Sequence, residues 1–442
     1  MKFYKSLFTT NLFYYCIFAM AALFIVSFFI KPIYPIAQYI FLGFLVYAGL
    51  DLMMLYATKN GLKITRNYPD RLSNGDYNDL KIEVINLYPI SIKARVLEEL
   101  PIQLQIRDFE IKNKLKKNQV EEFNYQIRPT KRGEYIFRNC NAFVKIFGLF
   151  ERRYQLETEE NLACYPSFLQ LKKYQLLATT NRLHELGVKK IRKIGSTLEF
   201  DTIKTYTLGD EYRHINWKAT AKTHRLMVNQ FQDEKAQPIY SFLDMSRSMR
   251  MPFEQMTLLD YAINSSLVLS SISLLKQDKA GLLTFSKNIE KHIVADKKNH
   301  QMQLILETLY NIKTDFKESE YGKLYTYMRH HISQRSLIFL YANFETLDAL
   351  NRQMNYLQLM KKSHIIVVII FKNSELKELA LQEANQSLEI YNQIIAEKFL
   401  NEKELIIQKL HQSGIQTIYT EPQNLTVNSI NKYLEIKARG LI

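Results

Sequence analysis

The chain has 442 residues, of which 47% are hydrophobic and 23% charged, so two or three domains with packed cores are expected. Its formal net charge of +15 allows nucleic acid or an anionic membrane surface as a partner. The lysines are scattered and no block of Lys and Arg stands out, so a solvated basic surface is the simpler interpretation. The three cysteines, Cys16, Cys140 and Cys164, exclude a metal site of regular cysteine spacing, and such sparse usage fits a reducing compartment.

Residues 1–58 are predicted to form a transmembrane helical hairpin. The run Leu7–Ile30 is almost wholly apolar, and a second run from Ile33 to Leu55 is apolar up to Asp51. Each run reaches the roughly 20 residues that a bilayer-spanning helix needs. The break "KPIYP" between them contains two prolines, which can end one helix and start the next. A cleaved signal peptide is the alternative, but the first run is too long and a second span follows at once.

The charges that flank the hairpin predict its orientation. Basic residues lie on both outer sides of the two runs, and only Lys31 lies between them. The flanking residues are Lys2, Lys5, Lys59, Lys63 and Arg66. The positive-inside rule then places both ends in the cytoplasm, with the rest of the chain facing the cytoplasm from the inner membrane. The basic residues after the second run would also favour anionic lipid headgroups of the bilayer.

Residues 61–166 are predicted to form an all-β, immunoglobulin-like sandwich. "LKIEVINL" alternates polar and apolar residues, and "FNYQIRP" and "YIFRNCNAFVKI" also have the pattern of strands. The sequences "NGD" and "RGEY" are turn signals between such runs. No constellation of catalytic residue types occurs here, so we expect a structural or adhesive role.

The connecting segment, residues 167–237, contains the most distinctive sequence of the chain, from Gly195 to Lys235. It combines many charges of both signs with the only tryptophan, Trp217. Such a segment is either a binding groove or a network of ion pairs that fastens an irregular segment to the fold. On the structural interpretation we expect Trp217 to be largely buried, and Arg213 or Lys218 to pair with Asp210, Glu211 or Glu199. His214 has no partner at metal-ligand spacing and no nucleophile to serve as a base.

Residues 238–442 are predicted to form a doubly wound parallel sheet, because apolar strands alternate with helices. The predicted strands are Pro238–Leu243, Ala280–Ser286, Ser336–Ala342, His364–Phe371 and Gly414–Thr420. The predicted helices are Thr257–Gln277, Asn299–Tyr310, Lys323–Gln334 and Val427–Lys437. Sheets of this kind bind ligands outside the carboxyl ends of their strands, where "LDMSRSM" follows the first strand.

The connecting segment together with "LDMSRSM" resembles the bacterial membrane proteins of the "domain of unknown function 58" family. The matching signature positions are Gly195, Glu199, Phe200, Tyr206, Gly209, Asp210, Arg213, Ile215, Trp217, Lys218, Asp244, Ser246, Ser248 and Met249. The usual Ala-Arg after the tryptophan is Ala221–Lys222 here, a mild departure. The resemblance covers nearly the whole chain and implies a von Willebrand factor A-like α/β domain. It also implies a protein partner of the MoxR-type AAA ATPase class.

In von Willebrand A-like domains, D-x-S-x-S is the first loop of a metal-ion-dependent adhesion site, whose oxygen ligands suit Mg²⁺. The residues that match it here are Asp244, Ser246 and Ser248. The later aspartate of the family site is replaced by Asn343, and Thr314 is the nearest candidate for the loop threonine. The site is therefore degenerate, with weak or absent Mg²⁺ binding expected. Alternatively, Asp244 and the serines only cap the following turn.

The function predicted from these features is a membrane-anchored cytoplasmic scaffold or adaptor, not an enzyme, working with a MoxR-type ATPase. A metal-dependent hydrolase is the first alternative, but no nucleophile and base pair is evident in the sequence. A nucleic-acid-binding protein is the second, and since only net charge favours it, no nucleic acid is expected as a partner.

Overall fold

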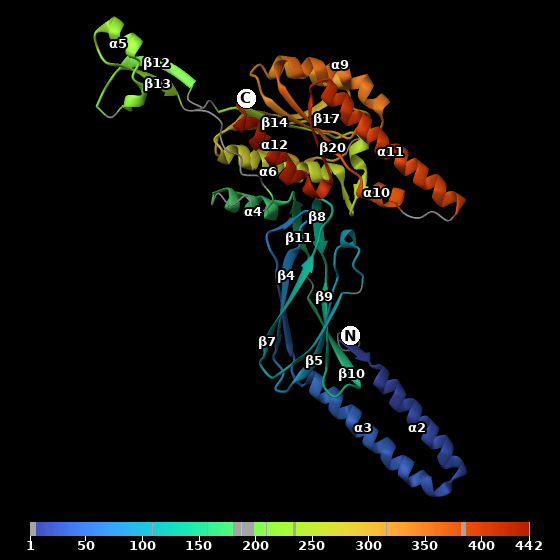
Figure 1. Cartoon of the computed structure of the whole chain (residues 1–442). Coiled ribbons are helices and arrows are strands. Elements are labelled where there is room, and N and C mark those ends of the chain that lie inside the picture. The colour runs from blue at the N-terminus through green and yellow to red at the C-terminus, as the bar shows by residue number, and fades with distance from the viewer. Residues whose placement is uncertain are drawn as a thin grey trace. The chain divides into compact units, whose positions relative to one another are not determined.

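The computed structural model describes residues 6–107, 109–156, 158–179, 187, 199–208, 210–232, 236–314, 316–381 and 386–441 (Figure 1). Contacts within the chain divide it into two compact units, Met1–Tyr165 and Pro166–Ile442. The first unit contains the N-terminal helices and a β-rich region, and the second contains the α/β sheet.

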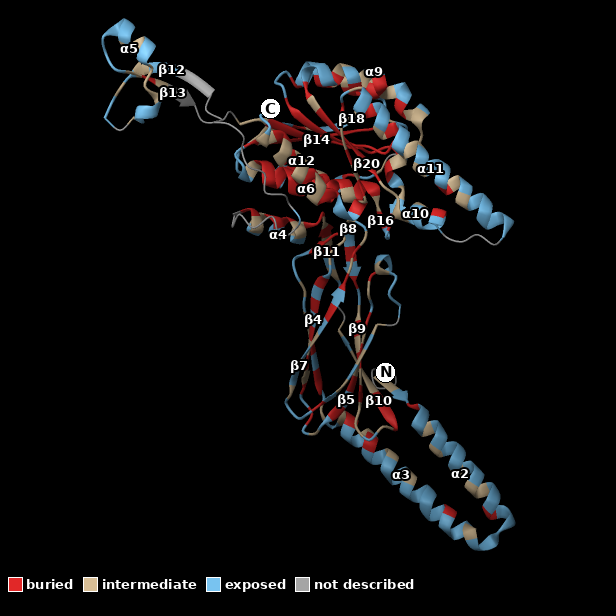
Figure 2. Cartoon of the chain, in the orientation of Figure 1, coloured by how far each residue is buried: buried red, intermediate tan, exposed pale blue. Residues whose placement is uncertain are grey.

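The first unit begins with a pair of apolar helices, α2 (Asn11–Phe29) and α3 (Tyr34–Ala57), joined by the short 3-10 helix η1 (Lys31–Ile33). A proline lies in the first turn of both η1 and α3, where its missing N–H leaves no hydrogen bond unmade. Both long helices are apolar and long enough to cross a membrane. Most of the residues in both helices are exposed (Figure 2). The two predicted apolar helices are thus present.

The limits of the hairpin differ from the prediction. Leu7–Thr9 form strand β1, which pairs with the edge of strand β10 (Phe150–Leu156), so the first helix begins only at Asn11. An edge strand offers unpaired backbone groups, and this short segment satisfies them. At the other end of the hairpin Asp51 is fully buried in the first unit. The last two turns of α3 therefore pack against the β-rich region.

The end of α3 is held by side chains of the β-rich region. The guanidinium of Arg152 donates to the carbonyl oxygens of Leu55 (2.8 Å), Thr58 (2.7 Å) and Lys59 (2.7 Å). The hydroxyl of Tyr88 donates to the same Leu55 oxygen at 2.8 Å. These carbonyl groups have no partner within a helix, so Arg152 and Tyr88 complete the hydrogen bonding of its last turn.

Three sheets enclose the core of the β-rich region. A five-stranded sheet has the order β1-β10-β9-β5-β6, and two three-stranded sheets have the orders β2-β4-β7 and β3-β11-β8. All described pairs in them are antiparallel except β3 with β11. The remaining strands are β2 (Leu62–Asn67), β3 (Arg71–Ser73), β4 (Asn78–Asn86), β5 (Ile92–Glu98), β6 (Glu110–Leu115), β7 (Val120–Ile127), β8 (Gly133–Phe137), β9 (Cys140–Lys145) and β11 (Glu160–Tyr165).

One apolar core is shared by the three sheets. In β4 every second residue is buried, so Leu80, Ile82 and Val84 point inward while the residues between them lie outside. Cys140 and Cys164 are buried in the same core as free thiols. The predicted β-rich region is therefore present, with its strands alternating as the sequence indicates.

The second unit is built around a six-stranded sheet of order β18-β17-β14-β19-β20-β21. The strands are β14 (Pro238–Asp244), β17 (Lys279–Phe285), β18 (Ile289–Asp296), β19 (Leu337–Tyr341), β20 (Ile365–Phe371) and β21 (Gln416–Thr420). The five predicted strands are parallel, and the sixth, β18, which was not predicted, runs antiparallel at one edge. The reason is the short connection after β17, which makes a hairpin and leaves no room for a crossover helix.

Helices cover both faces of this sheet. The helices are α4 (Phe168–Thr179), α6 (Leu258–Leu275), α7 (Gln301–Asn311), α8 (Tyr321–His331), α9 (Leu347–Ser363), α10 (Ser374–Leu381), α11 (Ser387–Gln412) and α12 (Leu425–Ala438). Residues of α4, α6, α7 and α12 share one core with the sheet, and residues of α8, α9 and α11 share the other. Along β19 the side chains alternate between these cores, Phe339 to the first and Leu340 to the second. The predicted doubly wound arrangement is present.

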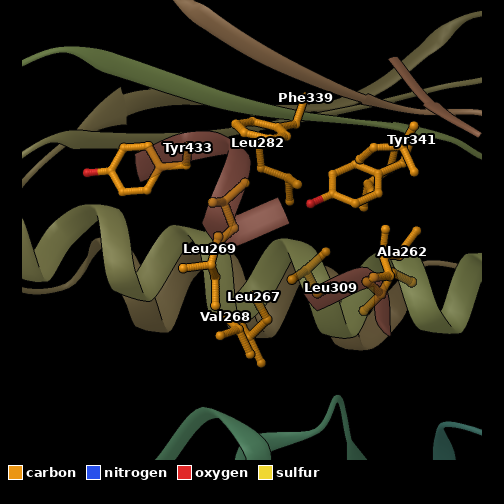
Figure 3. Packing of buried hydrophobic residues seen from close by; sticks show 14 of the residues in the cluster. Ala262, Leu267, Val268, Leu269, Leu282, Leu309, Phe339, Tyr341 and Tyr433 are labelled. Carbon is orange, nitrogen blue, oxygen red and sulfur yellow. The ribbon is translucent and has the colours of Figure 1, made fainter. Parts of the chain in front are cut away.

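Helix α6 is the third helix of the chain that is long and apolar enough to span a membrane, but it is buried against the sheet. Figure 3 shows Ala262 and Leu269 of this helix facing Leu282, Phe339 and Tyr341 of the sheet. Its N-terminus carries a capping box, in which the side chain of Thr257 accepts from the N–H of Asp260 and the carboxylate of Asp260 accepts in return. Helix α6 is therefore a helix of the hydrophobic core, with a polar cap at its N-terminus and buried serines along its length.

The signature segment forms a small substructure of its own. Strands β12 (Glu199–Thr205) and β13 (Met227–Gln232) make an antiparallel hairpin, and between them lie η4 (Tyr212–His214) and α5 (Trp217–Thr223). A second, very short hairpin, β15 (Pro252–Phe253) with β16 (Met256–Thr257), precedes α6.

Candidate functional site

The carboxyl ends of β14 and β19 lie beside a polar cavity of about 180 Å³. This is the edge at which doubly wound sheets hold their ligands. The cavity is lined by Asp244, Ser246, Arg247, Ser248, Lys317, Glu318, Ser319, Tyr321, Asn343, Phe344, Glu345, Thr346, Ala349, Arg352 and Gln353. The four predicted metal-site residues, Asp244, Ser246, Ser248 and Asn343, are thus brought together around one cavity.

Asp244 organises the loop that follows β14. Its Oδ1 atom accepts a hydrogen bond from the backbone N–H of Ser246 at 2.8 Å and a second from the hydroxyl of Ser319. The hydroxyls of Ser246 and Ser248 lie 3.0 Å apart, within hydrogen-bond distance. Burial raises the pKa of the Asp244 carboxyl, although the bonds from Ser319 and Ser246 oppose this. The carboxylate therefore orients the loop, as expected from the sequence.

Ser319, and not Thr314, supplies the hydroxyl from the second loop. It lies between α7 and α8, immediately before the first turn of α8. This loop is fastened to the first one, because the N–H of Arg247 donates to the Lys317 oxygen at 3.2 Å and the Arg250 guanidinium lies 4.4 Å from the Phe316 ring centre. The prediction of Thr314 as the loop hydroxyl is therefore wrong, because the loop reaches Asp244 several residues later in the chain, at Ser319.

Asn343 uses both atoms of its amide within the protein. Its Nδ2 donates to the carbonyl oxygen of Ser248 at 3.1 Å, and its Oδ1 accepts from the ammonium of Lys403 at 2.9 Å. Lys403, on α11, also donates to the carbonyl oxygen of Phe344 at 2.5 Å. Sequence reasoning did not include Lys403 in the site.

The Lys403 ammonium is strongly desolvated, which lowers its pKa to about 8. Glu345 and Glu402 oppose this shift through their negative charges. At neutral pH the group is still predominantly protonated, so a positive charge lies beside the oxygen of Asn343.

The residues present do not fit a divalent cation. The cavity wall offers one buried carboxylate, Asp244, whereas Mg²⁺ in proteins favours anionic oxygens in an octahedral set. The Oδ1 atom of Asn343 already accepts a hydrogen bond from the Lys403 ammonium. A metal cation at the same oxygen would have to displace this ammonium or be repelled by its positive charge. In the described part of the chain no group of three or more His, Cys, Asp and Glu side chains could hold a metal ion.

The signature segment differs from its structural interpretation. Trp217, the first residue of α5, is 69% exposed, and Tyr212 is 75% exposed, so the expected burial of the tryptophan is wrong. The reason is size: a two-stranded hairpin with one short helix encloses too little volume to bury an indole, and of its large apolar side chains only Val228 is buried among the described residues.

The ion pairs observed in this segment also differ from those that were expected. Asp210 accepts from the N–H and hydroxyl of Thr207, both at 2.9 Å, and pairs with Lys204 at 2.9 Å. These contacts, the backbone bond first, lower the pKa of Asp210 to about 2. Among the described residues neither Arg213 nor Lys218 makes an ion pair within 4.0 Å.

The other signature positions are distributed around the same hairpin. Tyr206 stacks on Tyr212 with ring centres 5.9 Å apart. Glu199 begins β12, opposite Gln232 of β13. Gly195 and Gly209 lie outside the described residues. Of the aromatic signature positions whose burial is described, Trp217 is exposed and Tyr206 is half-buried.

Comparison with known proteins shows what part of this chain is similar to. Residues 202–386 match the model of the family described as "Protein of unknown function DUF58". The "Uncharacterized protein YeaD" of Bacillus subtilis (strain 168) is 25% identical over 215 residues, which cover 47% of this chain and 52% of the relative. The chain thus spans about half the length of the curated relative it matches.

Two solved structures are similar to part of this chain at low identity. Protein BatB from Bacteroides thetaiotaomicron shares 13% identity over 46% of this chain and 100% of that chain, with a TM-score of 0.33. The SpRpn10 VWA domain shares 12% identity over 44% of this chain and 93% of that chain, with a TM-score of 0.28.

Proposed function

We propose that the chain, whose residues 202–386 match the model of the DUF58 family, belongs to that family, carries a von Willebrand A-like domain and is a membrane-anchored adaptor that docks a protein partner. The observation that carries this proposal is the exposure of four large side chains on the signature segment, two of them aromatic. We call these residues, Leu208, Tyr212, Trp217 and Leu226, the signature surface.

The signature surface has the composition of a binding hot spot. Trp and Tyr are the residues most enriched among those that contribute most to protein interfaces. Isolated exposed apolar residues are ordinary, but several large ones on one small substructure are typical of an interaction site. All four residues lie within the region matched by the family model, residues 202–386.

The partner class is taken from the family resemblance: a MoxR-type AAA ATPase, met on the cytoplasmic side of the inner membrane. The two N-terminal apolar helices support anchoring in the bilayer, and the flanking positive charges support the cytoplasmic orientation. We assign the β-rich region, as an immunoglobulin-like sandwich, the role of a spacer. No nucleic acid is required by this account.

A metal-dependent hydrolase is less well supported. No histidine lines the described wall of the polar cavity, and the hydroxyl of Ser319 is directed to a buried carboxylate that it helps to hold in place. A nucleophile needs a base that is free to take its proton. The polar side chains of this cavity are better explained as groups that stabilise the loops at the carboxyl edge of the sheet.

The test is a binding measurement with the full chain in lipid nanodiscs and the purified MoxR-type ATPase encoded by the same genome. Trp217→Ala should weaken binding roughly thirtyfold, as expected for loss of a hot-spot tryptophan worth about 2 kcal/mol. Lys222→Ala, an exposed change on the same helix, is the matched control and should bind as the unmodified chain does. Equal binding by the Trp217→Ala chain would contradict the proposal.

A further inference from the structure

A second cavity of about 310 Å³ adjoins the polar one, and its wall is mostly apolar. Asn343, Glu345 and Lys403 contribute to the second cavity, and the first two also line the polar one. Its walls come from the β15 region, the ends of β20 and β21, α10 and α11. The lining residues are Met251, Pro252, Phe253, Leu258, Asn343, Glu345, Phe371, Lys372, Asn373, Leu376, Phe399, Leu400, Lys403, Tyr419 and Pro422. We call this cavity the α11 groove.

The Lys403 ammonium lies in the wall of the α11 groove and has no counterion among the described residues. Its two hydrogen bonds go to neutral oxygens, those of Asn343 and Phe344. No carboxylate of the described residues lies within 4.0 Å of it, although Glu345 and Glu402 are near enough to act on its charge. An ammonium carries three N–H donors, so one donor remains for another acceptor. A desolvated cation of this kind is stabilised most by an anionic oxygen.

Helix α11 extends the apolar surface beyond the groove. Leu388, Tyr391, Ile395 and Phe399 recur at helical spacing along one face, and Phe399 also lines the groove. Leu388 and Tyr391 are more than 60% exposed. Figure 1 shows that α11 projects past the strands of the sheet. This stripe is too long for one small molecule bound in the groove to cover.

We propose that the α11 groove binds an apolar segment of a protein partner that carries one carboxylate, with the Lys403 ammonium as the group that receives that carboxylate. The inference rests on the proposed function, since it names the chemistry of a docked partner, but it concerns a site distinct from the signature surface. An acidic residue between large apolar ones would pair with Lys403 while its neighbours occupy the groove and the stripe.

The surrounding charges favour an acidic segment. Five basic residues line the two adjoining cavities: Arg247, Lys317, Arg352, Lys372 and Lys403. Three acidic residues do so: Asp244, Glu318 and Glu345. The hydroxyls of the neighbouring polar cavity already bond within the protein, so they do not distinguish a peptide from a lipid. The excess of basic side chains and the length of the apolar stripe on α11 are the features that favour an acidic peptide.

The test is a selection of peptides from a random display library against the full chain in nanodiscs. Selected peptides should contain Asp or Glu next to Leu, Phe or a similar residue. In fluorescence anisotropy, changing that Asp to Asn in a selected peptide should weaken binding about ten- to hundredfold, the effect of one charge-assisted hydrogen bond. Lys403→Met should abolish the difference between the two peptides, whereas Lys398→Met, an exposed change on the same helix, should preserve it.

A further variant and further binding measurements can also refute the inference. Tyr391→Ser, at an exposed position, should weaken both peptides equally by a few-fold without altering the fold. Selected peptides without acidic residues, or an Asp preference that survives Lys403→Met, would overturn the inference. Peptide binding that EDTA abolishes would also overturn the inference, because it would show a metal-dependent site. Lys403-dependent binding of vesicles that contain anionic lipids, without binding of peptides, would overturn it as well. ATPase binding, measured on the same preparations, separates failure of this inference from failure of the proposed function.

Discussion

Replacing Asp51 by asparagine tests how firmly the apolar helices are joined to the β-rich region. Asp51 is fully buried, and its two carboxylate oxygens accept from the N–H groups of Phe147 (3.1 Å), Leu149 (3.0 Å) and Phe150 (3.1 Å). Asparagine has nearly the same shape, but it keeps one acceptor and turns an NH₂ group toward donors. The substitution therefore removes the charge and leaves N–H groups unsatisfied in a buried place.

The magnitude follows from these three bonds. A hydrogen bond to a charged group contributes about 1.5–3 kcal/mol, but three bonds to one carboxylate are not additive, and one acceptor remains. We expect a loss of about 3 kcal/mol in the free energy of opening this junction, which corresponds to roughly 100-fold faster amide exchange.

Hydrogen exchange measured by mass spectrometry on the full chain in nanodiscs gives this quantity directly, in peptides that contain residues 147–150. Asp79→Asn is the matched control, because Asp79 is exposed and accepts one bond from the Gln126 side chain. The control should leave exchange at residues 147–150 unchanged. Unchanged protection in the Asp51→Asn chain would refute the reasoning that this carboxylate fixes the junction.

Three further predictions concern the second unit. The pKa of Lys403 is lowered to about 8 in the folded state, against 10.5 for an ordinary lysine. Between these two pH values the folded chain has lost this proton while the unfolded chain retains it, so stability rises with pH across that window. Lys403→Met should remove a contribution on the order of 3 kcal/mol to that rise in denaturant titrations, and an unchanged slope would show that the ammonium is solvated. Trp217→Ala should change the free energy of unfolding by less than about 0.5 kcal/mol, as expected at an exposed position, and a loss of several kcal/mol would restore the structural interpretation of the signature. In calorimetric titration Mg²⁺ should bind weakly or not at all to the unmodified chain; Asn343→Asp alone should pair with Lys403, and only Asn343→Asp with Lys403→Met should bind the ion appreciably, so tight binding by the unmodified chain would contradict the donor-set argument.

Much of the fold follows from local patterns in the sequence. The apolar runs near the N-terminus, the alternation in β4 and the buried strand β14 each indicate their element directly. Strand β18 was not predicted, because its mixed residues form no continuous apolar run and an edge strand carries no sign of its direction. The same is true of β1, whose three residues continue an apolar run.

The candidate site was predicted in part. D-x-S-x-S placed Asp244 and its serines correctly, because their spacing is local to one loop. Ser319 and Lys403 come from distant segments, and only the folded chain brings them to that loop. One signal for Lys403 was available: it lies seven residues from Ala396 and from Leu410, both buried, so it occupies the apolar face of its helix. Exposure of Trp217 had no such signal, since a tryptophan in a charged segment is compatible with burial or with binding.

The most direct test of the central claim is photo-crosslinking in living cells from position 217. A photoreactive amino acid in place of Trp217 should yield a covalent adduct with another protein, which mass spectrometry should identify as a MoxR-type ATPase, whereas the same group at position 222 should yield far less. Adducts confined to this chain itself, at either position, would contradict the account of the signature surface as a site where a partner docks.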